Sequence, residues 1–328
     1  MRAWLLSDFT GLDALRLTAD LSQPTPGNEE VLIRVHMAAL NPADRFLAEN
    51  LYPAKPPLPH VLGRDGMGVV EAVGAGVARR RAGDRVVILR GEAGVNRWGT
   101  LADYVMVPQD GIAPVPNQWS DSEAAAAPLV YLTAHQALNQ WGPLTGAVVL
   151  ITGVSGGVGI ASLQLAKCLG CRVIGLSRGT AKSERLRKLG CDLVLDPGDE
   201  ALKKKVKEFT AGRGVDLAID NVAGPLFNTL PEVLGYGGRI SVVGMLAGNV
   251  PNFSTAKLLF RRLRIGGVQV GDQTPQEAQR HWSEIVTLLT RTHQRPVVDA
   301  VFPFADLRLA FDRLAEGPFG KVLVNIAE

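Results

Sequence analysis

The strongest constraint on the fold is a regular alternation of apolar and helix-like segments over residues 147–292. Short runs rich in Val, Ile and Leu alternate with segments of helical periodicity. Strands are expected at residues 147–152, 171–177, 192–196, 215–222, 238–245 and 263–270. Helices are expected at residues 158–169, 180–189 and 199–211, after Pro225, near Ser254 and at residues 275–292. Apolar strands joined by helical crossovers predict an α/β fold with a doubly wound, parallel six-stranded sheet.

The N-terminal third of the chain has a different pattern. Residues 31–39, 68–73 and 84–89 alternate apolar and polar side chains between frequent Pro and Gly residues, which predicts short strands in a sandwich or partly open barrel. The segments 295–301 and 321–326 are β-like again, and we expect this tail to return to the first domain. The predicted domains are therefore a β-rich one from residues 1–119 and 272–328, and a doubly wound one from residues 120–271. Ser120 is expected to cap the helix that follows.

Composition excludes several classes of protein. A chain of 328 residues is long enough for two domains, and a net charge of +3 is too small to indicate a nucleic-acid partner. No apolar run reaches the roughly 18 residues of a membrane span, and the N-terminus has no signal-peptide pattern. We therefore expect a cytoplasmic protein with no membrane or nucleic-acid partner.

The three cysteines, Cys168, Cys171 and Cys191, do not form a disulfide framework. The CxxC spacing of the first two suggests a redox pair or half a zinc site. Cys168 lies late in a predicted helix and Cys171 starts a strand, so the pair straddles a helix end. A zinc site also needs a second pair of ligands. We therefore interpret all three as buried structural thiols.

A glycine-rich turn follows the first strand of the alternating region and opens a helix. Its sequence is Thr152-Gly-Val-Ser-Gly-Gly-Val-Gly159. Glycines allow a pyrophosphate to approach the backbone, and a helix N-terminus attracts an anion. The spacing differs from GxGxxG, but the strand–turn–helix context predicts cofactor binding. The candidate residues in this turn are Gly153, Ser155, Gly156, Gly157, Val158 and Gly159.

The second strand indicates which cofactor binds. NAD sites usually place an acid about 20 residues after the glycine turn, but residues 160–183 contain no Asp or Glu. The strand ends instead in Ser177 and Arg178, with Lys182 nearby. Hydroxyl and cationic groups can bind a 2′-phosphate, which an acid would repel. The sequence therefore predicts NADPH rather than NADH.

Several ordered motifs resemble the medium-chain dehydrogenase/reductase superfamily over essentially the whole chain. They are Asn41-Pro-Ala-Asp44, Leu51-Tyr-Pro53, the segment 59–74, Ala82-Gly-Asp-Arg-Val86, Leu132-Thr-Ala134, Asp220-Asn-Val-Ala-Gly224 and Phe319-Gly-Lys-Val-Leu323. Within the superfamily the chain resembles the zinc-free quinone oxidoreductase branch, and its C-terminal part resembles an alcohol dehydrogenase-like bacterial group. The resemblance implies a GroES-like catalytic domain, a Rossmann domain and a cleft between them.

Zinc-dependent members bind their catalytic metal with Cys, His and Cys. By the resemblance, the matching positions hold Asn41, Arg64 and Leu129, and none of these suits zinc. Residues 75–115 contain no cysteine for a structural zinc. Ala43 and Phe46 stand where relatives have a proton-relaying hydroxyl and histidine. We therefore expect no metal.

Hydride transfer to a quinone or an α,β-unsaturated carbonyl needs little electrophilic help, so we expect this reaction. A donor must still stabilise and protonate the substrate oxygen. By the resemblance, Tyr52 is the first candidate donor; alternatively it is only a cleft wall. Asn41 can donate through its amide. Arg64 either binds an anionic group or forms an ion pair with Asp65 or Asp44, which we favour.

The resemblance implies further residues beside the cofactor. They are Thr133, Asn221, Val222, Gly244 and Met245 at the end of the fifth strand, Val268 and Val270 on the sixth, and Lys321. Lys321 is expected to reach the pyrophosphate, with Asp44 as its partner. Relatives form homodimers through the sixth strand, and we expect the same of this chain.

Two other functions stay open. One is an enoyl-thioester reductase or a zinc-free alcohol dehydrogenase. The other is a non-catalytic NADPH-binding protein, because the glycine turn predicts cofactor binding and not catalysis.

Overall fold

The computed structural model describes residues 1–89, 92–248 and 254–327, and its chain divides into two compact units. Unit 1 contains Met1–Leu129, Val270–Val286 and Arg295–Glu328, and unit 2 contains Val130–Gln269 and Thr287–Gln294. Each unit has its own sheet and its own apolar cluster. The predicted boundaries between catalytic and nucleotide-binding domains, at residues 119/120 and 271/272, stay a prediction.

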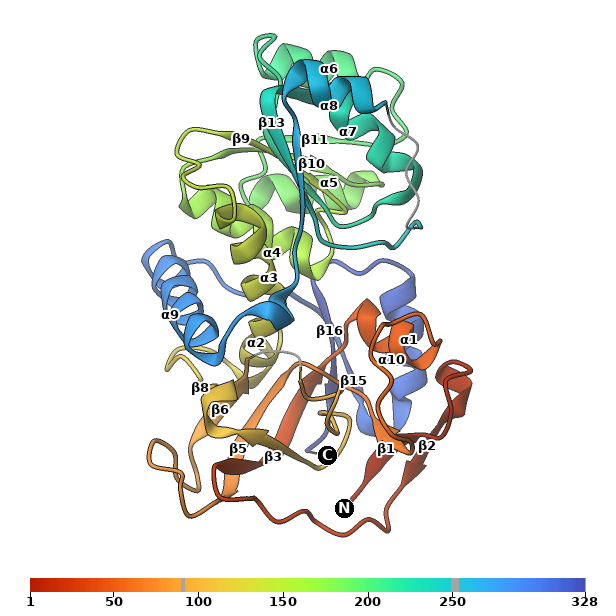
Figure 1. Ribbon diagram of the computed structural model, residues 1–328, viewed down its shortest axis with the longest axis vertical. Coiled ribbons are helices and arrows are strands. Elements are labelled where there is room, and N and C mark those ends of the chain that lie inside the picture. Colours follow the sequence, from red (N-terminus) through yellow and green to blue (C-terminus); the bar gives the residue numbers. More distant parts are fainter. Residues whose placement is uncertain (90–91, 249–253, 328) are drawn as a thin grey trace. The chain divides into compact units, whose positions relative to one another are not determined.

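Unit 2 is built on a parallel six-stranded sheet, as predicted (Figure 1). Its strands are β9 (Val148–Thr152), β10 (Arg172–Leu176), β11 (Leu193–Leu195), β12 (Val215–Asp220), β13 (Leu234–Val242) and β14 (Arg264–Gly267). The spatial order is β11-β10-β9-β12-β13-β14. This is the doubly wound order. Successive strands are added toward one side of the sheet from β9 to β11 and toward the other side from β12 to β14, so the direction of addition reverses between β9 and β12.

Helices connect these strands and contribute to an apolar core. They are α3 (Pro128–Asn139), α4 (Gly157–Cys168), α5 (Thr180–Lys188), α6 (Leu202–Phe209), α7 (Leu230–Val233) and α8 (Thr255–Arg261). Leu150, Ile174 and Ala218 from three neighbouring strands are fully buried in one cluster with Leu202 of α6 and Leu230 of α7. Near-continuous apolar strands are typical of a sheet that is covered on both faces.

Three predicted elements of unit 2 differ from the structure. The segment after Pro225 is a 3-10 helix (Gly224–Thr229) that leads into α7, rather than one continuous α-helix. β13 ends at Val242 instead of Met245, and β14 ends at Gly267 instead of Val270. An edge strand can pair only as far as its neighbour extends, so β14 loses its partner where β13 ends. Gly244, Met245 and Val268 therefore lie beyond the strands, and Val270 lies in the 3-10 helix Val270–Asp272.

The helical segment after Ser120 is interrupted. Ser120 caps α2 (Asp121–Ala125) through a capping box with Glu123, as predicted. The helix does not continue, because Pro128 lacks a backbone N–H and starts a new helix, α3.

Unit 1 contains two sheets. The larger one has the order β15-β16-β3-β5-β6-β8, with β7 also paired to β3, and the smaller one has the order β2-β1-β4. The larger sheet consists of β3 (Glu30–Ala39), β5 (Gly66–Val73), β6 (Arg85–Ile88), β7 (Tyr104–Pro108), β8 (Ile112–Pro114), β15 (Val298–Pro303) and β16 (Lys321–Asn325). The smaller one consists of β1 (Ala3–Leu6), β2 (Leu15–Thr18) and β4 (His60–Val61). β16 pairs with β3, so the predicted return of the tail is confirmed.

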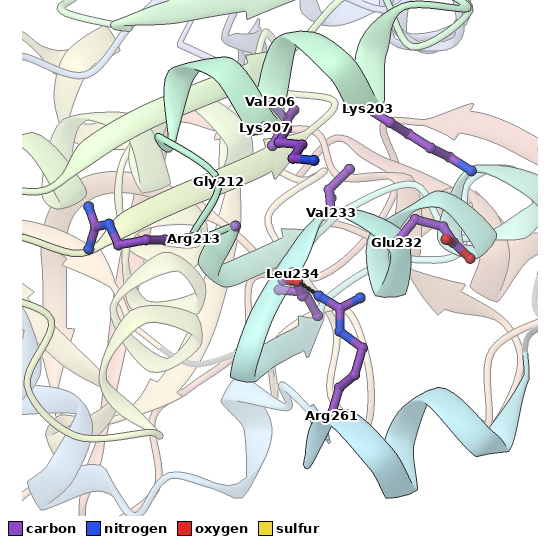
Figure 2. A pocket seen from close by; sticks show the side chains of 10 residues that line it. Lys203, Val206, Lys207, Gly212, Arg213, Glu232, Val233, Leu234 and Arg261 are labelled. Carbon is purple, nitrogen blue, oxygen red and sulfur yellow. Dashed lines mark hydrogen bonds between the residues drawn. The ribbon is translucent and has the colours of Figure 1, made fainter.

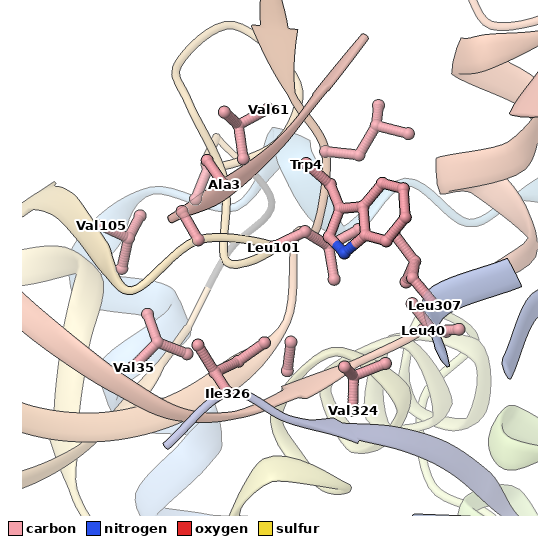
Figure 3. Packing of buried hydrophobic residues seen from close by; sticks show 14 of the residues in the cluster. Ala3, Trp4, Val35, Leu40, Val61, Leu101, Val105, Leu307, Val324 and Ile326 are labelled. Atoms are coloured by element: carbon pink, nitrogen blue, oxygen red, sulfur yellow. The ribbon is translucent and has the colours of Figure 1, made fainter. Parts of the chain in front are cut away.

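The helices of unit 1 are α1 (Pro42–Ala48), α2 and α10 (Leu307–Ala315), and α9 (Pro275–Arg291) begins in this unit. Buried side chains from both ends of the chain meet in its core, as Figure 3 shows for Trp4, Leu40 and Val324. The Trp4 indole donates a hydrogen bond of 2.9 Å to the carbonyl of Phe304. The burial of these apolar side chains stabilises the packing of the C-terminal segment in the core of unit 1.

Two of the three cysteines are buried, as predicted. Burial raises the pKa of the Cys171 and Cys191 thiols to about 11, so both are poor nucleophiles. Cys168 is only half-buried at the end of α4, and its sulfur lies 3.0 Å from the Thr292 hydroxyl. All three thiols are free. None of the helices in the described ranges is long and apolar enough to cross a membrane.

Two glycines of the turn after β9 differ in the space around them. A Cβ atom on Gly159 would lie 2.4 Å from the carbonyl oxygen of Gly153, whereas one on Gly156 would lie 3.5 Å from that oxygen. We expect Gly159→Ala to destabilise the protein by about 1–3 kcal/mol through overpacking. Gly156→Ala should cost less than about 1 kcal/mol, from a weaker helix cap. Urea unfolding followed by circular dichroism measures both without any ligand, and equal losses would contradict this packing argument.

Candidate functional site

The glycine-rich turn connects β9 to the N-terminus of α4. Gly153 has a φ of +56°, a conformation that favours glycine, and Gly156 donates a backbone hydrogen bond of 3.0 Å to the Gly153 carbonyl. Gly156 occupies the N-cap of the twelve-residue helix α4. The turn therefore brings the six candidate residues between 153 and 159 together. Backbone N–H groups and the positive end of a helix dipole suit a phosphate group here.

Polar side chains join β9 and β12 where the strand order reverses. The Thr152 hydroxyl donates a 2.7 Å hydrogen bond to Asp220 Oδ1, and the Asn221 amide donates one of 2.8 Å to the Thr152 carbonyl. The roles of Thr152 and Asp220 were not predicted from the sequence. Their signal was a polar residue at the carboxyl end of each apolar strand, the edge where ligands of such sheets bind.

Two buried acceptors beside this turn have no hydrogen-bond partner among the described residues. They are Asp220 Oδ2 and Asn221 Oδ1. A Cβ atom on Gly153 would lie 3.0 Å from Val222 Cγ2 and 3.8 Å from Asn221 Cβ, so this segment contacts the turn. Unpartnered buried acceptors are costly unless a ligand supplies donors. Hydroxyl or carboxamide donors of a dinucleotide would satisfy them, so the residues present fit such a cofactor.

The end of β10 also lies beside the glycine turn. Val154 donates a backbone hydrogen bond of 3.3 Å to the carbonyl of Leu176, the last residue of β10. Ser177 follows and is buried, whereas Arg178 is exposed. Lys182 lies in the first turn of α5. This end of the strand carries no carboxylate, which leaves room for a negatively charged group.

The remaining candidate cofactor residues lie outside the glycine turn and the end of β10. Gly244 contacts Asn221, because a Cβ atom on it would lie 2.5 Å from the Asn221 carbonyl oxygen. Met245 is exposed, and Thr133 is buried in α3. Val268 donates a backbone hydrogen bond of 2.9 Å to the carbonyl of Val242. Val270 belongs to unit 1 and not to the sheet of unit 2.

A buried ion pair lies beside helix α1 in unit 1. Arg64 donates from Nε to Asp44 Oδ1 at 3.0 Å and from Nη2 to the Ala43 carbonyl at 3.0 Å. Asp44 Oδ2 accepts a 2.9 Å hydrogen bond from the backbone of Asn41, the N-cap of α1. Burial lowers the pKa of Arg64, but Asp44 and Tyr52 together raise it by more, so the net shift of the pKa is upward and Arg64 stays charged. The predicted ion pair with Asp44 is therefore confirmed.

Tyr52 lies against this ion pair. The Arg64 guanidinium carbon is 4.6 Å from the centroid of the Tyr52 ring, within the range of a cation–π contact. The Tyr52 side chain is partly buried, so its ring is held by Arg64 while part of it stays exposed.

A second buried ion pair involves Lys321, and the predicted partner was wrong. Lys321 Nζ lies 3.3 Å from Asp65 Oδ2 and donates a 2.8 Å hydrogen bond to Asn41 Oδ1. The Leu40 backbone donates to the Val322 carbonyl at 3.0 Å, and this register places Lys321 over Asp65 instead of Asp44. Burial lowers the pKa of Lys321 and raises that of Asp65, and their mutual attraction opposes both shifts.

The three positions that the resemblance matches to zinc ligands do not offer groups that suit that ion. The Asn41 amide oxygen is bound to Lys321, Arg64 carries a positive charge, and Leu129 offers only an apolar side chain. Zinc in proteins prefers thiolate, imidazole and carboxylate ligands. Within the described ranges, no three His, Cys, Asp or Glu side chains are grouped so that they could hold a metal.

A cavity of about 200 Å³ in unit 2 lies at the amino ends of the strands, opposite the end that carries the glycine turn. Its lining includes Gly214, just before β12, and Leu234, the first residue of β13, whereas the glycine turn follows the last residue of β9. Figure 2 shows Lys203 and Arg213 extending away from each other instead of converging on one point. This cavity is therefore separate from the candidate site.

Two families match the chain. The family described as "Alcohol dehydrogenase GroES-like domain" matches residues 27–117, and the family described as "Zinc-binding dehydrogenase" matches residues 157–291. The quinone oxidoreductase of Rattus norvegicus is 29% identical over 99% of this chain and 97% of its own length.

Solved structures show the same likeness. An NAD-dependent alcohol dehydrogenase is 32% identical, covers 100% of both chains and has a TM-score of 0.90. A mycobacterial protein in complex with NADPH is 29% identical, covers 99% of this chain and 100% of its own, and also has a TM-score of 0.90. A fold shared over full length at this identity establishes common membership. The chain is therefore an oxidoreductase of the medium-chain dehydrogenase/reductase superfamily, similar to its quinone oxidoreductases.

Proposed function

We propose that this protein transfers a hydride from NADPH to a quinone or an α,β-unsaturated carbonyl without zinc. The observation that carries the proposal is the buried network of Asn41, Asp44 and Arg64, which holds paired charges and hydrogen-bond donors at positions that the resemblance matches to a zinc site. The cofactor supplies the hydride, and the protein binds, orients and protonates the substrate.

The paired charges favour a neutral acceptor. Asp44 neutralises Arg64 and Asp65 neutralises Lys321, so the network carries no net charge. Such a site offers no unpaired cation for a carboxylate substrate, but it can hold hydrogen-bond donors in place. Quinones and enones are neutral, and they develop negative charge on oxygen only during hydride transfer.

Two side chains are proposed as donors to that oxygen. Asn41 Nδ2 donates to the Ala39 carbonyl at 3.1 Å. Burial raises the pKa of the Asp65 carboxyl and a hydrogen bond from the same amide opposes that rise, so the proposed N–H donor lies beside a buried carboxylate. The Tyr52 hydroxyl is the proposed proton donor, with its ring fixed by Arg64 at 4.6 Å. The alternative, that Tyr52 is only a wall of the site, predicts that the hydroxyl can be removed without loss of turnover.

Unit 2 is proposed to bind the cofactor. The glycine turn and the unpartnered acceptors of Asp220 and Asn221 support a dinucleotide, and Ser177 and Arg178 at the end of β10 support a 2′-phosphate. The residues proposed to contact it are Thr133, Gly153, Ser155, Gly156, Gly157, Val158, Gly159, Ser177, Arg178, Lys182, Asn221, Val222, Gly244, Met245, Val268 and Val270. We propose residues 1–119 and 272–328 as the catalytic domain.

We expect the purified protein to oxidise NADPH rapidly with 1,4-benzoquinone or 2-hexenal, and a chelator should not change the rate. Tyr52→Phe should lower kcat about 10²-fold, because general acid catalysis typically contributes 10²–10⁴-fold. Absorbance of NADPH at 340 nm measures the rates, and Tyr104→Phe is the matched control. Unchanged turnover in Tyr52→Phe would leave Tyr52 only as a wall.

The same assay separates the other functions. Oxidation of NADPH only with crotonyl-thioester would favour an enoyl-thioester reductase, and turnover only with ketones or aldehydes would favour an alcohol dehydrogenase. Tight NADPH binding without turnover of any acceptor would favour a non-catalytic binding protein.

The preference for NADPH gives a second prediction. Arg178→Ala should raise the Kd for NADPH about tenfold and leave that for NADH unchanged, because a charged hydrogen bond contributes about 1.5–3 kcal/mol. Cofactor fluorescence measures both constants. Arg187→Ala, an exposed arginine further along α5, is the matched control. Equal effects on both cofactors would contradict a contact with the 2′-phosphate.

We also propose a homodimer formed through the edge of the unit 2 sheet. β14 pairs only with β13, and its Ile265 is 37% exposed. Leu259 and Phe260 of α8, the helix just before β14, are 70% and 76% exposed. Exposed strand edges and clustered apolar side chains are typical of surfaces that another chain covers. A second copy of this chain is the proposed occupant.

A charge on this edge should separate the two copies. We expect Ile265→Lys to change a dimer into a monomer in analytical ultracentrifugation, because lysine on an edge strand opposes pairing. Leu309→Lys, at an exposed apolar position of unit 1, is the control and should stay dimeric. A monomeric wild-type protein would refute the proposed interface.

A further inference from the structure

We infer that Lys321 is a positioning residue that fixes the Asn41 amide, instead of a ligand of the cofactor pyrophosphate. The inference rests on the proposed function, in which Asn41 donates to the substrate. It also revises the role that the resemblance assigns to Lys321.

Lys321 makes two hydrogen bonds and one ion-pair contact, all inside unit 1. A lysine ammonium has three N–H donors. Lys321 Nζ lies 2.9 Å from the Leu40 carbonyl oxygen, 2.8 Å from Asn41 Oδ1 and 3.3 Å from Asp65 Oδ2. The residue is only 4% exposed. A contact with a phosphate would therefore require the loss of one of these buried partners.

The same contacts define the orientation of the Asn41 amide. Its oxygen accepts from Lys321 and its nitrogen donates to the Ala39 carbonyl at 3.1 Å. A flipped amide would place two donors against the ammonium and an oxygen against a carbonyl, so both contacts would become repulsive. The orientation of the Asn41 amide is therefore fixed before a substrate binds, which is the preorganisation that charge stabilisation requires.

Asp65 completes the arrangement. It is fully buried, and its Oδ1 accepts a 3.4 Å hydrogen bond from the Leu129 backbone while its Oδ2 faces Lys321. The carboxylate opposes the effect of burial on Lys321 and so favours the ammonium form, which is a donor with no lone pair. A neutral amine could accept a hydrogen bond and would allow the amide to rotate.

The test is Lys321→Met, with Lys167→Met as the matched control. Lys167 also donates to a carboxylate, Asp192, and to a carbonyl, that of Cys171, but it lies far along the chain from this network. We expect Lys321→Met to lower kcat at least 30-fold, to change the Kd for NADPH less than threefold, and to move the side-chain NH₂ signal of Asn41 in a ¹⁵N spectrum. Asn41→Ala assigns that signal.

An increase of tenfold or more in the Kd for NADPH would identify Lys321 as a pyrophosphate ligand and overturn the inference. An unmoved Asn41 signal would overturn it as well. Lys321→Arg separates the roles further, because a guanidinium restores charge for a phosphate but cannot match three acceptors around an ammonium. We expect kcat to stay low in that variant, and recovery would contradict positioning.

Removal of Lys321 leaves Asp65 as an unpaired buried charge, which can prevent folding. The double variant Lys321→Met/Asp65→Asn removes both charges and should fold, and the same effects on kcat and on the Asn41 signal are expected. If the wild-type protein reduces no quinone or enone, the proposed function fails. The Kd for NADPH and the NMR signal still decide the role of Lys321.

Discussion

The chemistry of unit 1 depends on the pairing of four buried charges. Arg64 with Asp44 and Lys321 with Asp65 form two ion pairs whose members are nearly or completely buried. Removal of one partner from such a pair typically costs about 3–5 kcal/mol, because the other charge stays buried without compensation. The pairs therefore hold Asn41 and Tyr52 by contacts that are costly to break. A site made in this way provides directed donors and no net charge.

In unit 2 the candidate cofactor residues are positioned by the backbone of the sheet and not by ion pairs. The parallel sheet brings the carboxyl ends of β9, β10 and β12 to one edge, and the glycine turn, Ser177 and Asn221 meet there because each follows one of these strands. The unpartnered oxygens of Asp220 and Asn221 point to a ligand with donors. Binding at this edge follows from topology, whereas the choice between NADPH and NADH depends on the few side chains after β10.

Much of this fold could be predicted from local patterns. The apolar runs and the glycine turn predicted the doubly wound parallel sheet of unit 2, because only a few topologies satisfy right-handed crossovers. Side-chain partners were harder. Asp44 and Asp65 are both carboxylates that could pair with Lys321, and the sequence does not show which of them the fold brings within reach; Lys321 Nζ lies 3.3 Å from Asp65. The residues at which β13 and β14 end could not be predicted from either segment alone, because each strand extends only as far as the two pair with each other. The hydrogen bond between Thr152 and Asp220 could not be predicted either, because these residues meet only when β9 and β12 pair in the sheet.

Under the proposed function, polar side chains of unit 1 take the role that a zinc ion has in metal-dependent dehydrogenases. A zinc ion polarises a carbonyl strongly with one charge, so a metal-dependent site can act on simple alcohols and ketones. An amide N–H and a phenol hydroxyl stabilise less charge, and they suffice only when the substrate spreads that charge over a conjugated system. A site that relies on Asn41 and Tyr52 in place of zinc would therefore be restricted to conjugated acceptors, in agreement with the proposed function. Such a site would also need Asp44 and Lys321, because polar donors must be oriented by their neighbours where no metal orders them.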